Sequence, residues 1–177
     1  MIGAAMFNSA TYEEIEADRN ALGEAILVVV LVTVCGIVGG IIDGLISGGG
    51  LGGLVRGIIV GLLFGIVRWA LWVTVLNFVG GKMLRTSDTE TNWSEIGRVL
   101  GYAYTPGVLS LLVFIPVVGV PLSLVGFVWT LAAVVVGARQ ALDFDSTGRA
   151  IAAVLLSAVI GFIPWIIVVA IQGALTG

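Results

Sequence analysis

Apolar residues are gathered into five long runs, and short polar segments separate them. The runs span about residues 25–42, 57–79, 99–119, 121–138 and 150–171. Because a helix rises about 1.5 Å per residue, roughly 20 apolar residues cross the hydrocarbon core of a bilayer. Each run comes near that length, and a soluble core of 177 residues does not need five of them. The pattern predicts an all-α fold, a polytopic membrane bundle with five transmembrane helices.

The first 24 residues differ from the rest because they are polar and acidic. Tyr12, Ile15 and Leu22 fall on one helical stripe beside the acidic positions, which predicts an amphipathic surface helix over residues 9–23. Thr11 and Glu14 have the spacing of a capping box, as do Asn92 and Glu95. Residues 1–24 are therefore expected to form a surface segment that leads into the first span, within one domain over residues 1–177.

Residues 99–138 form 40 positions without a charge, broken by Pro106, Pro116 and Pro121. Proline removes a backbone donor and interrupts a helix. This stretch is compatible with two full crossings or with a re-entrant hairpin. Both alternatives return the chain to the same side of the membrane.

Basic residues set the orientation of a membrane protein, because Lys and Arg near span ends favour the cytoplasmic side. With five crossings, one side collects Arg19, Lys82, Arg85, Arg98, Arg139 and Arg149, and the other side receives Arg56 alone. This asymmetry predicts a cytoplasmic N-terminus and a C-terminus outside. The excess of Arg over Lys is typical of a prokaryotic chain, so the cell (inner) membrane of a prokaryote is the expected location.

Composition narrows the classes of function. The chain is 59% hydrophobic and 11% charged, with a net charge of −3 and no histidine. The absence of a basic tract argues against nucleic-acid binding. The absence of histidine removes the usual proton shuttle and the commonest metal ligand, and no nucleophile lies near a base in the sequence. We therefore expect no enzyme activity and no cofactor or metal, with the lipid bilayer and another membrane protein, or a second copy of the chain, as partners.

Glycine recurs every four residues in the first two spans. The positions are Gly36, Gly40 and Gly44 in the first span, and Gly57, Gly61 and Gly65 in the second. Stripes of small residues allow helix backbones to approach closely within a membrane. The two stripes predict packing of the first span against the second, and the competing interpretation is homo-oligomerisation through one stripe.

Arg68 lies near the middle of the second run. An arginine at a helix centre costs roughly 2.5–3.5 kcal/mol on insertion scales, and such residues usually face the bundle. We expect Arg68 to point inward and to bind the carbonyls of Tyr102 and Ile160, which Pro106 and Pro164 would free. The alternative is that Arg68 snorkels to the interface.

The segment Asn92–Pro106 reads NWSEIGRVLGYAYTP and follows a Gly-Gly step. This arrangement resembles the central signature of the Yip membrane-protein family. The positions that carry the resemblance are Gly80, Gly81, Gly101, Tyr102 and Pro106. The resemblance implies five spans and a cytoplasmic N-terminus. Eukaryotic members contact Rab GTPases through long N-terminal regions, and the short segment here departs from that pattern, so no Rab-type partner is expected.

The features together predict a non-enzymatic scaffold or adaptor that organises or docks membrane components. The alternative is a small-solute or ion transporter or channel that uses the Arg68 region. A solute path needs a polar stripe shared by several spans. The spans carry only scattered polar residues.

Overall fold

A computed structural model describes residues 1–46, 54–86, 89 and 92–176, and this part of the chain contains helices and no strand. The elements follow one another along the chain as α1 (Ile2–Ala5), α2 (Ser9–Ala17), α3 (Ala21–Ile46), α4 (Leu54–Phe78), the π-helical η1 (Val79–Met83), α5 (Trp93–Ala103), the 3-10 helix η2 (Thr105–Phe114), α6 (Gly119–Ala141) and α7 (Thr147–Thr176).

Within the described residues, four helices are long and apolar enough to cross a membrane. They cover Ala21–Ile46, Leu54–Met83, Gly119–Ala141 and Thr147–Leu175, and α5 with η2 supplies a fifth if that pair forms one span. The all-α polytopic bundle expected from the sequence is therefore confirmed. The helices are longer than the apolar runs, because hydrogen bonding continues into polar flanks that a hydropathy pattern leaves out.

The third apolar run is broken rather than straight. α5 and η2 meet at 42°. Pro106, in the first turn of η2, has no N–H for the carbonyl of Tyr102, and the Thr105 hydroxyl donates to that carbonyl at 2.6 Å instead. Such a pair is either a broken span or a re-entrant loop. The two alternatives expected for residues 99–138 both remain.

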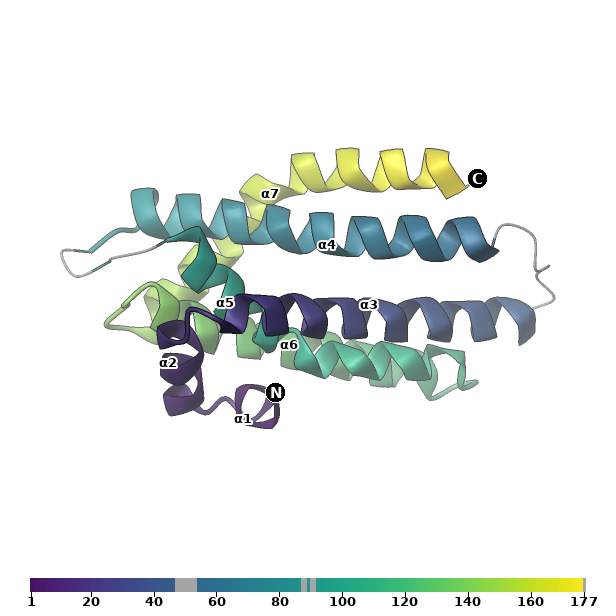
Figure 1. Cartoon of the computed structure of the whole chain (residues 1–177), viewed down its shortest axis with the longest axis horizontal. Coiled ribbons are helices and arrows are strands. Elements are labelled where there is room, and N and C mark those ends of the chain that lie inside the picture. The colour runs from purple at the N-terminus through teal and green to yellow at the C-terminus, as the bar shows by residue number, and fades with distance from the viewer. Residues whose placement is uncertain (47–53, 87–88, 90–91, 177) are drawn as a thin grey trace.

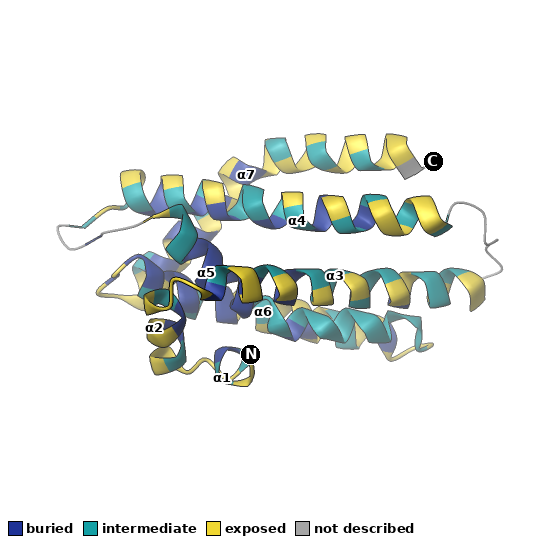
Figure 2. Cartoon of the chain, in the orientation of Figure 1, coloured by how far each residue is buried: buried dark blue, intermediate teal, exposed yellow. Residues whose placement is uncertain are grey.

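Figure 1 shows how the long helices are arranged. α4 and the C-terminal half of α7 run side by side, and α3 lies beside η2, which packs on α6. α2 and the junction of α6 with α7 lie at one end of the bundle, whereas the C-terminal ends of α3 and α7 lie at the other. Burial is concentrated near the α2 end, where residues 96–103 of α5 are all buried (Figure 2).

The N-terminal helix is shorter than expected. α2 ends at Ala17, because Asp18 has extended backbone dihedrals, and α3 begins as a separate helix at Ala21. The predicted Thr11–Glu14 capping box is wrong, because the helix starts one turn earlier and Asn8 is its cap. The Asn92–Glu95 box is confirmed at the start of α5, where each residue's side chain accepts the other's backbone N–H.

Candidate functional site

Tyr12 fastens α2 to the bundle. Its side chain is fully buried, and its hydroxyl lies 2.9 Å from the carbonyl oxygen of Ala4 and 3.2 Å from that of Ala133. Gly137 on α6 leaves room for the ring, because a Cβ there would lie 3.2 Å from the Tyr12 ring. One tyrosine therefore joins α1, α2 and α6.

Arg98 provides a second tie between α2 and α5. It is 3% exposed, and its guanidinium donates to the Ile15 carbonyl at 3.2 Å, to the Ser94 hydroxyl at 3.0 Å and to the Glu16 carbonyl. The two carbonyls belong to the last turn of α2, where the helix dipole is negative. From the sequence, Arg98 was expected only to contribute to the orientation in the membrane. Its place in the capped segment Trp93–Ala103 was the available signal for this role.

We call the unit formed by α1, α2 and α5 the α2 platform. Its outer side is acidic, because Glu13 and Glu14 are exposed on α2. Burial, followed by the charges of Asp143, Glu95 and Glu13, raises the pKa of Glu16 to about 7, against the lowering effect of Arg98. Burial is the main cause of this shift, and the three neighbouring carboxylates add to it.

Two signature residues lie where α5 approaches α3. A Cβ on Gly101 would lie 2.6 Å from the Cβ of Ala25 and 2.9 Å from its carbonyl oxygen. The neighbouring Tyr102 hydroxyl donates to the Glu24 carboxylate at 2.5 Å. Only glycine fits at Gly101 without a backbone shift.

The other signature residues lie at helix breaks. Gly80 and Gly81 lie in η1, and a Cβ on Gly80 would lie 2.5 Å from the Leu142 side chain. Pro106 is buried at the start of η2. The structure thus spreads these signature residues along the packing of the bundle and does not gather them into one pocket.

The glycines of the second span lie against side chains of α3. A Cβ on Gly61 would lie 2.9 Å from Ile37, and one on Gly65 would lie 2.6 Å from Thr33. Gly57 has no neighbour within 4 Å in the described residues. The structure therefore brings two of these three glycines to the α3–α4 contact.

The glycines of the first span point elsewhere. A Cβ on Gly36 would lie 3.4 Å from the Ser110 hydroxyl of η2, whereas Gly40 and Gly44 have no described neighbour within 4 Å. Gly39 was not predicted to be a contact, yet a Cβ there would lie 2.6 Å from the Ser110 carbonyl oxygen. The small residues of α3 thus admit the backbone of η2, and they do not face the glycines of α4.

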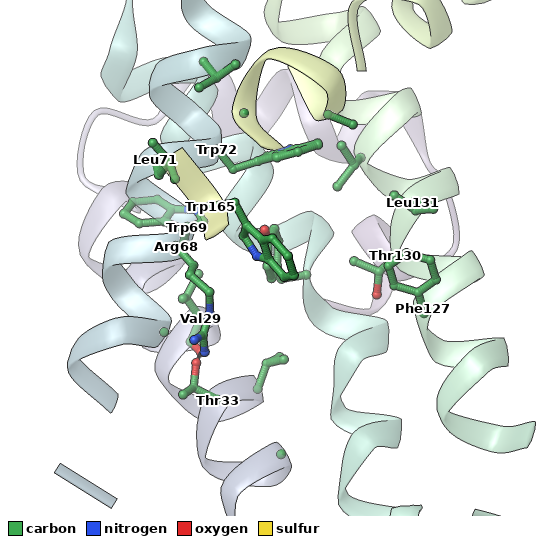
Figure 3. A pocket seen from close by; sticks show the side chains of 18 of the residues that line it. Val29, Thr33, Arg68, Trp69, Leu71, Trp72, Phe127, Thr130, Leu131 and Trp165 are labelled. Atoms are coloured by element: carbon green, nitrogen blue, oxygen red, sulfur yellow. Dashed lines mark hydrogen bonds between the residues drawn. The ribbon is translucent and has the colours of Figure 1, made fainter. Parts of the chain in front are cut away.

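Arg68 lines a cavity of about 850 Å³ whose walls come mainly from α3, α4, α6 and α7 (Figure 3). Its guanidinium donates to the side-chain oxygen of Gln172 on α7. The expected bonds to the Tyr102 and Ile160 carbonyls are therefore wrong. The Tyr102 carbonyl accepts a hydrogen bond from the Thr105 hydroxyl instead, and Arg68 reaches the side-chain amide of Gln172 across the cavity.

The remaining walls of the cavity are mostly apolar and aromatic, and they include Trp72, Phe127, Leu131 and Trp165. Two hydroxyls in the wall, Thr33 and Thr130, donate to carbonyls of their own helices at 2.7 Å and 2.8 Å. The buried Trp69 indole N–H, also in the wall, has no described acceptor. The polar groups left to meet a ligand are mainly hydrogen-bond donors.

The protein is thus a multi-pass α-helical membrane protein. The α2 platform is held at one end of its bundle by Tyr12 and Arg98, and a mostly apolar cavity surrounds Arg68. The chain belongs to the Yip1 domain family, whose match covers residues 4–168. No curated protein and no solved structure matches the chain.

Proposed function

We propose that this protein is a non-enzymatic scaffold that docks another membrane protein on the α2 platform. The platform faces the cytoplasm, the C-terminus lies outside, and the membrane is the inner membrane of a prokaryote. The distribution of Lys and Arg supports this orientation.

The observation that carries the proposal is the way α2 is held. Tyr12 and Ile15 bury its inner side, and Arg98 binds its last turn. A helix fixed in this way presents Glu13 and Glu14 outward without a further loss of backbone freedom when a partner binds. A surface helix that served only to anchor the chain to lipid would carry basic residues instead.

The charge of the platform indicates the chemistry of the partner. Glu13, Glu14 and Glu16 are on α2, and Glu95 and Asp143 contribute to the same negative field. A basic juxtamembrane segment of a second membrane protein complements this field. Anionic lipid head groups would be repelled by it.

Site-specific photocrosslinking in native membranes tests the docking. A photoreactive residue at Glu14 is expected to give a crosslink to a basic segment of another membrane protein. The double variant Glu13→Lys with Glu16→Lys should abolish this crosslink. Asp43→Lys is the matched control, because Asp43 is an exposed carboxylate near the far end of α3. A Glu14 crosslink that survives the charge reversal, or that reaches only lipid, would contradict the proposal.

Small-solute transport is the second candidate, and the cavity around Arg68 is the observation that favours it. Its walls are mostly apolar, whereas a solute path needs polar groups along its length. Proteoliposomes separate the two functions: a scaffold leaves vesicle permeability to small anions unchanged, whereas a transporter raises it and loses that activity in Arg68→Gln.

A further inference from the structure

We propose that the cavity between α3, α4, α6 and α7 binds a membrane amphiphile with one acyl chain and an acidic head group. The head group pairs with the Arg68 guanidinium, and the chain lies along the apolar walls. The site is separate from the α2 platform and does not depend on what docks there.

The first support is the unused bonding capacity of Arg68. A guanidinium has five N–H donors, and the described residues give it one acceptor, the amide oxygen of Gln172. That amide is neutral, so it leaves the positive charge in place. No carboxylate pairs with Arg68 in the part of the chain that the structure describes. Arg68 is half-buried, and a partly desolvated guanidinium with free N–H donors favours an anion from outside the chain.

The second support is a further donor near the same place. Tyr104 lines the cavity and lies close enough to Arg68 to interact with it electrostatically. Its phenolic hydroxyl is a hydrogen-bond donor. Arg68 and Tyr104 together can hold the oxygens of one carboxylate or phosphate.

The third support is the size and chemistry of the rest of the cavity. A volume of about 850 Å³ is within the roughly 300–1,000 Å³ of ligand-binding pockets. Phe162 and Trp165 stack with ring centroids 6.1 Å apart, and Trp72 and Phe127 belong to the same lining. Such walls suit a hydrocarbon chain, which a free inorganic anion lacks. The bilayer supplies amphiphiles of this kind directly.

The test uses the purified full chain in a non-ionic detergent and a dibrominated stearate as the probe. Bromine quenches indole fluorescence at contact, and Trp72 and Trp165 line the cavity. We expect a saturable quenching component that unlabelled oleate displaces. Oleyl alcohol, which has the same chain and no charge, should displace it poorly, and inorganic phosphate should not displace it.

Two substitutions on α4 form a test variant and its control, and a third on α7 tests the apolar space. Arg68→Gln removes the charge in the cavity and should weaken binding about tenfold or more. Arg56→Gln removes an exposed charge from the same helix and should leave binding unchanged. Gly161→Leu keeps Arg68 and fills the space beside Val75, where a Cβ would have only ordinary contacts at 3.8 Å, so it should also weaken binding.

Each contrary outcome overturns a named part of the proposal. A wild-type chain without saturable quenching would rule out the site. Equal affinity in Arg68→Gln, or equal displacement by oleyl alcohol, would rule out recognition of the acidic head group. Displacement by inorganic phosphate would mean that the acyl chain is not required. If both cavity variants fail to fold, the competition between oleate and oleyl alcohol on the wild-type chain still tests whether the acidic head group is recognised.

Discussion

At the residue scale, two arginines differ in how many of their N–H donors find an acceptor within the fold. Arg98 donates to two carbonyls at the end of α2 and to a serine hydroxyl, and so becomes part of the packing. Arg68 has one neutral acceptor and faces a cavity. From the sequence, Arg68 was expected to bind backbone carbonyls because it lies inside an apolar run, whereas Arg98 was counted only among the charges that set the orientation. In the structure it is Arg98 that binds backbone carbonyls.

Glu16 makes stability depend on pH. Its pKa in the folded protein is raised to about 7, whereas an unfolded glutamate has a pKa of about 4.3. The folded state therefore binds this proton more tightly, and the contribution of Glu16 to stability falls as the pH rises from about 4.3 to about 7. Glu16→Gln should remove this component and be more stable than the wild type at pH 8.

The measurement is the midpoint of thermal unfolding in detergent between pH 4 and pH 8. Glu14→Gln is the control, because Glu14 is exposed on the same helix. A Glu16→Gln profile that keeps the full slope of the wild type would show that another group is responsible.

At the element scale, the helices were predictable because each long helix contains its own apolar run. Which helices pack against each other was not predictable. Four apolar runs became long helices, and the prolines marked the break between α5 and η2. The four-residue glycine period of α3 did not mark its closest contact, because Gly40 and Gly44 have no described neighbour. The close contact is at Gly39, outside that period, where the backbone of η2 in the third run comes near. The pairing of Arg68 with Gln172 joins residues 104 positions apart, and no local pattern encodes it.

The close contact at Gly101 gives a test of element packing. Gly101→Ala would place a Cβ against the backbone of Ala25, which no rotamer change relieves, and should destabilise the protein by about 1–3 kcal/mol. Gly40→Ala is the matched control. It has no described neighbour and should be neutral or gain up to about 1 kcal/mol of helix propensity.

Thermal unfolding of both variants in detergent measures whether Gly101→Ala loses stability and Gly40→Ala does not. A Gly101→Ala variant as stable as Gly40→Ala would show that α3 and α5 are not in close contact. A loss of stability in Gly40→Ala that depends on protein concentration would instead indicate a second copy packed on that stripe.

At the scale of the whole molecule, the scaffold account depends on where the two ends of the bundle lie. α2 is at one end, whereas the turn between η2 and α6 and the C-terminal end of α7 are at the other (Figure 1). Val117 in that turn is 93% exposed, and it separates the two alternatives for residues 99–138. If α5 and η2 cross the membrane, Val117 reaches the outer surface.

Labelling of single cysteines in a Cys35→Ser background, with a reagent that does not cross membranes, tests this arrangement most directly. Cysteines that replace Glu14, Val117 and Leu175 report on the platform, the turn and the C-terminal end. We predict that Val117 and Leu175 label from outside intact cells and that Glu14 labels only after the membrane is opened. Labelling of Glu14 from outside, or of Glu14 and Leu175 from the same side, would contradict a cytoplasmic docking platform on a five-span bundle.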